Sequence, residues 1–201
     1  MKTFLFLLPI LVLTSEAFAQ NDISSETFQL SFSTKKDGGQ FVFNGKSHYF
    51  SIDIIADSIS TSDNPNFIIA DNHIVQVSTI PLPPIKPDLQ NLTTMQQKVA
   101  LEAYVQYEMD YFKNQLNLNI GDLKKEWVTI NDRMWLIWSF DTPEQKQISE
   151  VTMKTKSQIY ASSICYNQVL DLNTPVMPEH NFKKSKALIN KMMASLKLVS
   201  K

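Results

Sequence analysis

The chain has 201 residues, of which 43% are hydrophobic, 19% charged and 10% aromatic, and this composition excludes a disordered or low-complexity protein. Its 19 Lys and Arg residues balance 20 Asp and Glu residues, so the net charge of −1 provides no broad basic surface for a nucleic acid. A single cysteine, Cys165, excludes a disulfide framework within the chain and a zinc site built from several thiolates.

The N-terminal residues 1–19 have the pattern of a secretory signal peptide. Lys2 supplies a positive charge, an apolar run covers residues 4–13, and Ala17 and Ala19 fit the small-residue rule for cleavage. A helix that spans a bilayer needs about 20 apolar residues, so this run is too short to serve as an integral membrane segment. We therefore predict cleavage after Ala19 and export of residues 20–201, as a single domain, to the periplasm or the extracellular space.

Short strands joined by tight turns are expected in the first part of the mature chain. Residues 27–33 alternate between apolar and polar side chains, which is typical of a half-buried strand. Turn-forming residues at 35–39 and 44–45 separate this strand from the next two. The strands expected in this part are 27–33, 40–43, 48–56, 67–70 and 73–80, and residues 56–66 are expected to form a loop.

The clearest predicted helix, residues 93–116, follows a proline-rich connector. Thr93 or Thr94 can cap its first turn, with Gln96 or Gln97 three residues later as the second half of a capping box. Apolar residues recur every three or four positions, so they share one face of the helix. These residues are Leu101, Val105, Met109, Phe112 and Leu116.

The clearest predicted hairpin covers residues 126–140, with Asn131-Asp132 as a two-residue turn. In this register Trp127 lies opposite Leu136, and Val128 lies opposite Trp135. Both faces of the hairpin are then apolar, and a strand that is apolar on both faces is normally covered on both sides. We therefore predict that these two strands are central in a layered sheet.

The last part of the chain predicts further strands and a second helix. Residues 150–172 should contain one or two strands, with 158–170 as the richer part, and Thr174-Pro175 and Pro178 predict a loop. Residues 181–198 predict a closing helix. The order of strands, long helix, strands and helix predicts an α+β fold, an antiparallel β-sheet with helices packed on it as an α/β/α sandwich.

In this order of elements the chain resembles the PsbP-like superfamily. The resemblance rests on the N-terminal hairpins, the proline-bounded entry to the long helix, the paired strands 125–130 and 133–140, a strand that begins at Gln158-Ile159-Tyr160 and runs to Val169-Leu170, and a final helix entered through Phe182 that ends at 195–198. That superfamily includes photosystem extrinsic proteins, the Ran-binding Mog protein and bacterial envelope proteins of the DcrB type. The resemblance implies a small binding or accessory domain, and it transfers no catalytic residue. Unlike the lipoprotein members, this chain has no cysteine at the predicted cleavage site to carry a lipid.

Sequence motifs for catalysis are absent. The chain contains no G-x-S-x-G, no H-E-x-x-H and no phosphate-binding or dinucleotide-binding loop. Cys165 lies within an apolar strand pattern, which favours a buried structural thiol over a nucleophile. The aspartates near the loop at 56–66 are interpreted as solvated, because their spacing is not that of a calcium loop. No cofactor and no metal are predicted.

The aromatic residues around the predicted hairpin are the most informative feature of the sequence. Trp127, Trp135 and Trp138 share this hairpin, and Tyr107 lies off the main apolar face of the preceding helix. A packed core between sheet and helix explains such a cluster. Alternatively, one apolar face is only partly covered, which leaves an aromatic groove for a lipid, a sugar or a peptide. The candidate ligand-binding residues are therefore Tyr107, Trp127, Trp135 and Trp138.

Three functions remain open from the sequence. The first is an exported, non-enzymatic binding or accessory domain that recognises an envelope protein or a small apolar ligand. The second is an exported hydrolase whose site forms only in the fold, and its first candidate residues are His48, Asp53, Asp57 and His73. The third is a structural subunit of an envelope complex.

Overall fold

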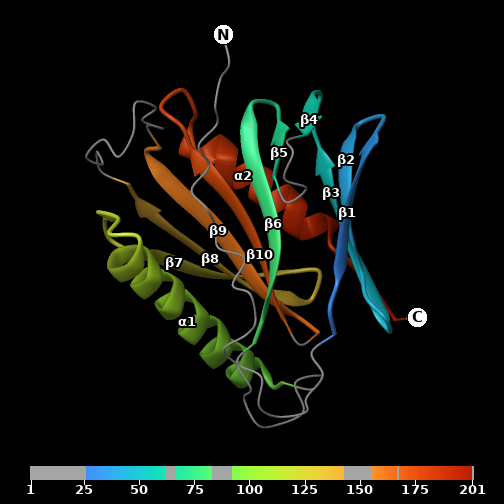
Figure 1. Cartoon of the computed structure of the whole chain (residues 1–201), viewed down its shortest axis with the longest axis horizontal. Coiled ribbons are helices and arrows are strands. Elements are labelled where there is room, and N and C mark those ends of the chain that lie inside the picture. The colour runs from blue at the N-terminus through green and yellow to red at the C-terminus, as the bar shows by residue number, and fades with distance from the viewer. Residues whose placement is uncertain (1–25, 62–66, 83–91, 143–154, 167, 201) are drawn as a thin grey trace.

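The computed structural model describes residues 26–61, 67–82, 92–142, 155–166 and 168–200. Two antiparallel sheets and two helices account for these residues (Figure 1). The predicted signal peptide, 1–19, and its cleavage site lie outside them. Neither helix of the described ranges is long and apolar enough to cross a membrane.

The larger sheet has seven strands in the order β4-β5-β6-β10-β9-β8-β7. Their bounds are Ile59–Thr61 for β4, Phe67–Ala70 for β5, His73–Pro81 for β6, Lys124–Ile130 for β7, Arg133–Asp141 for β8, Ser157–Cys165 for β9 and Gln168–Val176 for β10. The smaller sheet has the order β1-β2-β3-β11. Its strands are β1 (Gln29–Lys35), β2 (Gly38–Asn44), β3 (His48–Ile55) and β11 (Lys197–Ser200).

The helices α1 (Thr94–Asp110) and α2 (Phe182–Ser195) lie on opposite faces of the seven-stranded sheet (Figure 1). Alternate residues of each strand point to opposite faces, so β8 serves two cores. Its residues Trp135 and Ile137 pack with Ile189 of α2 and with the smaller sheet. Its residues Leu136 and Trp138 instead pack beneath α1. The predicted α+β architecture, with helices packed on an antiparallel sheet, is confirmed.

The predicted start of the long helix is confirmed. Thr93 is the N-cap, its side-chain oxygen accepts the Gln96 backbone N–H at 3.3 Å, and the Gln96 side chain accepts the Thr93 N–H at 2.9 Å. After Asp110 the helix continues as a π-helical segment, Tyr111–Gln115. The expected apolar face is buried at Leu101, Val105, Met109 and Phe112, and it lies on the seven-stranded sheet.

The predicted hairpin and its register are confirmed, because Trp127 pairs with Leu136 and Val128 pairs with Trp135. Asn131 and Asp132 have φ of 50° and 59°, as a type I′ turn requires. The prediction that both strands are central is wrong for β7, which is the last strand of its sheet. Apolar residues on both faces indicate that other elements pack above and below a strand. Such packing does not determine whether the strand is central or at the edge of its sheet.

The strands between residues 157 and 176 also differ from the predicted elements. Of the one or two strands expected within 150–172, the structure has two, β9 and β10, which form a hairpin that reverses at Tyr166, where φ is 55°. Thr174 and Pro175 belong to β10 instead of a loop. Proline is tolerated there because β6 pairs with β10 only as far as Asn173, so no described strand requires the missing N–H.

Two further strands replace predicted loop and helix. β4 lies within the loop expected at 56–66 and pairs with β5. The last helix ends at Ser195 instead of residue 198, and β11 pairs with β3, so that Leu198 lies opposite Phe50. Residues at such element ends have little local preference, and pairing with an available sheet edge decides their conformation.

Candidate functional site

A chain of buried polar side chains lies between α1 and the seven-stranded sheet. Ser162 of β9 is paired directly opposite Asp171 of β10. The Trp138 indole N–H donates to the Ser162 hydroxyl oxygen at 2.9 Å, and the Ser162 hydroxyl donates to Asp171 Oδ1. Asp171 is 4% exposed, and burial raises its pKa well above the ordinary value, with a further contribution from the charge of Glu108. Asp171 therefore holds its proton to a higher pH than an exposed aspartate does.

Glu108 of α1 faces this chain from the helix. Burial raises its pKa from 4.5 to about 7. The aromatic neighbours are Tyr104 and Tyr160, whose pKa values are raised by burial and by the charges of both carboxyl groups. Tyr160 stacks on Trp138 with 4.0 Å between ring centroids, and Tyr104 meets the Trp138 ring edge-on. We call Glu108, Asp171, Ser162, Tyr104 and Tyr160 the acid cluster.

The acid cluster has one chemical property of a catalytic site. Two carboxyl groups whose environments set different proton affinities can act as an acid and a base. The carboxyl groups nevertheless lie beneath α1. A cavity formed by described residues lies elsewhere, at β7.

That cavity, which we call the Trp127 pocket, has a volume of about 300 Å³. Trp127, Val128 and Thr129 of β7 form one wall, Thr94 and Lys98 of α1 form the other, and Asp132 and Met134 close the end at the hairpin turn. The Lys98 ammonium lies over the Trp127 ring, 5.4 Å from its centroid. The residues that line the pocket therefore combine an aromatic surface with one cation, one carboxylate and two hydroxyl groups.

Of the four predicted ligand-binding residues, the structure places only Trp127 and Tyr107 where a partner could reach them. Trp127 is half-buried in its pocket, and Tyr107 is 53% exposed on the outer side of α1. Trp135 and Trp138 are both 0% exposed and lie in the two different cores. These two tryptophans occupy core positions in this structure, and neither lines a groove.

Tyr107 belongs to a larger exposed stripe that the sequence analysis did not identify. Met95, Val99, Ala103 and Tyr107 follow one another at intervals of four residues, so they share the outward side of α1. Met95 is 71% exposed and Val99 is 61% exposed. We call these four residues the outer α1 patch. Their spacing was visible in the sequence, but which side of the helix faces outward depends on packing.

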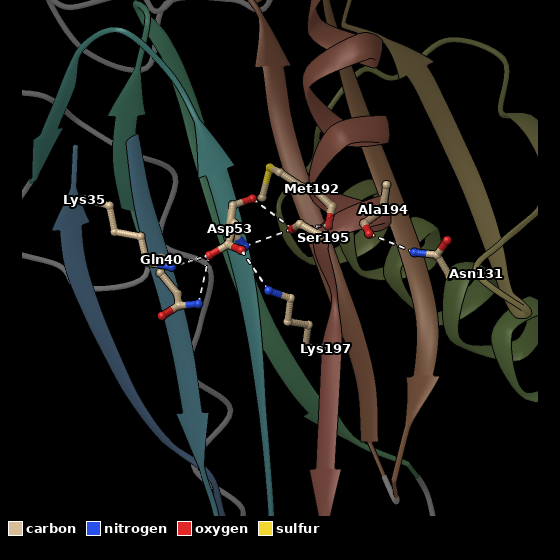
Figure 2. A network of polar contacts seen from close by, with 8 residues as sticks. All are labelled: Lys35, Gln40, Asp53, Asn131, Met192, Ala194, Ser195 and Lys197. Atoms are coloured by element: carbon tan, nitrogen blue, oxygen red, sulfur yellow. Dashed lines mark hydrogen bonds and ion pairs between the residues drawn. The ribbon is translucent and has the colours of Figure 1, made fainter. Parts of the chain in front are cut away.

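The four residues considered for a hydrolase occupy separate surroundings. His48 Nδ1 lies 2.7 Å from Glu26, His73 stacks on His180 at 4.2 Å, and Asp57 is exposed in the turn before β4. Asp53 lies at the centre of a polar network at the end of α2, which Figure 2 shows. In the part of the chain that the structure describes, no three His, Cys, Asp or Glu side chains come together where they could hold a metal ion.

The Asp53 network joins β3 to the end of α2. The Asp53 carboxylate lies 2.7 Å from Lys35 Nζ and 3.7 Å from Lys197 Nζ. It also accepts the Gln40 amide N–H at 2.8 Å. The Ser195 hydroxyl accepts the Asp53 N–H and donates to the Asp53 carbonyl, both at 2.9 Å. Every polar group of Asp53 in this network has a structural partner (Figure 2), so its role here is to fix the junction of α2 and β11.

The predicted buried thiol is confirmed. Cys165 is free and 0% exposed, and burial raises its pKa to about 12. A thiol of this kind is not a nucleophile at neutral pH.

Neither a protein-family model nor a curated protein sequence matches this chain. Among solved structures it is similar to the cyanobacterial PsbP protein CyanoP of a Synechocystis species, with a TM-score of 0.44, 8% identity and coverage of 90% of this chain and 98% of that one. It is also similar to the Ran-binding protein Mog1p of Saccharomyces cerevisiae, with a TM-score of 0.36, 11% identity and coverage of 85% and 96%. Both proteins, a PsbP and a Mog protein, are of kinds that the sequence resemblance named.

The sequence analysis missed both carboxyl groups of the acid cluster, although each has a local signal. Asp171 stands alone between Leu170 and Leu172 in an apolar strand that is buried along its whole length. Glu108 lies four residues after Tyr104 and three after Val105, on the inward arc of α1. An acidic residue at a position predicted to be buried indicates a perturbed carboxyl group. That the two groups lie close together is decided by the packing of α1 on β10.

Proposed function

We propose that the mature chain is an exported, non-enzymatic binding domain that docks a partner protein on the outer α1 patch. The observation that carries the proposal is the exposure of Met95, Val99 and Tyr107 on a helix whose opposite side is already buried on the sheet. A helix that is apolar on two sides is normally covered on both. Contiguous exposed apolar residues on a monomer mark such interaction sites.

The residues around the patch favour a protein partner over a membrane or a nucleic acid. Lys98, the only basic residue between positions 95 and 107, is half-buried over Trp127, and Glu102 is paired with Lys125 of β7. Anionic membranes and nucleic acids are bound by exposed Lys and Arg. A charge-poor surface with Met and Tyr is typical of the centre of a protein interface. The partner should therefore present an apolar, weakly charged surface.

Photo-cross-linking in cells that export the chain tests this proposal. A photoreactive residue is placed at Val99 or Tyr107, and at Ile55 as a control, because Ile55 is 57% exposed and lies outside α1, in β3. We expect the same discrete adduct from positions 99 and 107 and none from position 55. Ala103→Arg should abolish the adduct, whereas Ala103→Ser should retain it.

Three outcomes would contradict the proposal. They are the absence of a discrete adduct, the same adduct from position 55, and an adduct that survives Ala103→Arg. Ala103 is exposed, so its substitution should change the free energy of unfolding by no more than about 0.5 kcal/mol. The export step is checked on the same material, because the intact mass should correspond to residues 20–201.

A hydrolase is the second candidate, because the acid cluster pairs two carboxyl groups whose pKa values are raised by burial, to about 7 for Glu108. This function requires α1 to move, since the Asp171 carboxyl is buried beneath it. It predicts turnover of a substrate that is lost in Glu108→Gln while the fold persists. If the chain turns over no substrate and Glu108→Gln does not change its binding, the hydrolase is excluded and the binding function remains.

A further inference from the structure

β7 offers a free edge of the seven-stranded sheet. It pairs with β8, and no other described strand lies beside it. In a two-residue hairpin the residues that flank the turn, here Ile130 and Arg133, form a hydrogen-bonded pair, and such pairs alternate along the strands. The N–H and C=O groups of Lys125, Trp127 and Thr129 therefore point away from β8. Within the described residues these outward groups have no hydrogen-bond partner.

The charged side chains of β7 do not prevent another strand from pairing with this edge. Edge strands commonly use lysine and other charges to prevent pairing with another strand. In β7 each charge is paired within the fold: Lys124 lies 3.3 Å from Asp141, Lys125 is paired with Glu102 of α1, and Glu126 with Lys186 of α2. These pairs hold the side chains above and below the sheet, so an added strand would meet a largely unobstructed row of backbone groups.

The Trp127 pocket lies along the same edge. Its wall of Trp127, Val128 and Thr129 spans the outward-facing part of β7, and α1 forms the opposite wall. A strand added to β7 would direct every second side chain toward the α1 face, as Trp127 does. An aromatic side chain fits the chemistry of the pocket, because it can pack on the Trp127 ring and present its face to the Lys98 ammonium.

We propose that β7 binds an extended peptide segment of a partner protein as an eighth strand, with an aromatic side chain of the peptide in the Trp127 pocket. Main-chain hydrogen bonds to Lys125, Trp127 and Thr129 supply affinity, and the pocket supplies selectivity. This site is separate from the outer α1 patch, so it extends the proposed function and does not depend on it.

The probe is a phage-displayed library of short linear peptides selected on the full mature chain. We expect the selected peptides to share an aromatic residue within an alternating pattern. Amide hydrogen exchange, followed by NMR with and without peptide, is the deciding measurement. The amides of Lys125, Trp127 and Thr129 should exchange at least about tenfold more slowly with peptide bound. Those of Glu126 and Val128, which already face β8, should change little.

A pair of substitutions at Thr129 separates backbone pairing from side-chain contact. Thr129→Pro removes an outward N–H and leaves the ladder to β8 intact, and proline is tolerated on the free side of an edge strand. Thr129→Val keeps the N–H and the side-chain size. Peptide affinity should fall at least about tenfold in the proline variant and stay within about threefold in the valine variant.

The proposal is overturned by a library that yields no binder, by peptides that protect none of the three amides, or by equal affinity for the proline and valine variants. The exchange measurement on the unsubstituted chain decides the matter even where Thr129→Pro does not fold. Ala103→Arg, which disrupts the outer α1 patch, should bind the peptides unchanged. Loss of peptide binding in Ala103→Arg would place the peptides on the patch and also overturn the edge site, whereas failure of the cross-linking experiment alone leaves it standing.

Discussion

The two faces of the seven-stranded sheet differ in what covers them. The α2 face is closed twice, by α2 and by the smaller sheet, and the buried polar side chain that α2 contributes, Ser185, is uncharged. The α1 face is closed by α1 and the segment that follows it, and it holds the buried carboxyl group of Asp171. Burial of an ionisable side chain lowers stability, so the α1 face contains a group that a purely structural layer would avoid.

The surface of α1 supports the same division. The end of α2 is joined to β3 by the hydrogen bonds between Ser195 and Asp53. The same helix also packs in the core between the two sheets. The outward side of α1 carries exposed apolar residues, and its links to β7 are the Glu102–Lys125 ion pair and the Lys98–Trp127 contact. Both proposed binding surfaces therefore belong to the less constrained layer, where binding groups are commonly presented.

The largest expected effect is on the cover of the α2 face, at Gly38. Its φ is +133°, and a Cβ there would lie 1.9 Å from the Ile54 carbonyl oxygen, so Gly38→Ala must distort the pairing of β2 with β3. We expect a loss of about 3 kcal/mol or more in the free energy of unfolding, measured with urea. Gly121→Ala is the control, because its nearest contact is 3.3 Å and its expected cost is below about 1 kcal/mol. Equal losses in the two variants would show that the smaller sheet does not close the core.

A smaller effect should distinguish the two buried tryptophans. Trp138 donates its indole N–H to Ser162, whereas the Trp135 indole nitrogen has no hydrogen-bond partner among the described residues. Both side chains are 0% exposed, so replacing each by phenylalanine removes a similar packed volume. We expect Trp138→Phe to cost about 1 to 2 kcal/mol more than Trp135→Phe in urea unfolding, because only Trp138 loses a hydrogen bond. The reverse order would mean that the Trp138–Ser162–Asp171 chain does not stabilise the α1 face.

The pH dependence of stability should sharpen the comparison further. In the unfolded chain Glu108 ionises near pH 4.5, but in the fold it keeps its proton up to about pH 7. The folded state therefore binds more protons in this window, and its stability falls as pH rises from about 4.5 to about 7. The glutamine of Glu108→Gln stays neutral, so this variant should lack the decline of about 2 kcal/mol in the free energy of unfolding. The measurement is the difference between the two proteins in urea unfolding across this pH range.

Asp171 remains in both proteins and provides the internal background for that measurement. Its raised pKa lowers stability with rising pH in the same direction, and it does so in the variant as well. An unchanged slope in Glu108→Gln would mean that water reaches Glu108 freely and that α1 does not seal the acid cluster.

Local signals explain which elements could be predicted. The capping box at Thr93 and Gln96 and the turn at Asn131-Asp132 depend on a few neighbouring residues, so the sequence was sufficient for both. Predictions were wrong where a distant partner decides the outcome. β11 is a strand because the edge of β3 is available to it, and Pro175 remains in β10 because the pairing of β10 with β6 ends at Asn173.

The candidate site divides in the same way. Tyr107 and Trp127 were identified from residue type and helical position, and the structure places both at accessible positions on or beside α1. Trp135 and Trp138 have the same residue type, but their alternating directions in a doubly covered strand bury them in two different cores. Residue type identifies side chains capable of binding, whereas exposure depends on the layers that pack above and below.

The sequence by itself determined the α+β class, the long capped helix, the main hairpin with its register and the buried thiol, because periodicity and turn chemistry act over short distances. Only the tertiary structure decided that β7 is an edge strand, that the outward side of α1 is apolar, and that Glu108 and Asp171 share one buried site. These properties arise from the order of strands across the sheet and from the side on which each helix packs, and the residues involved are distant in the chain.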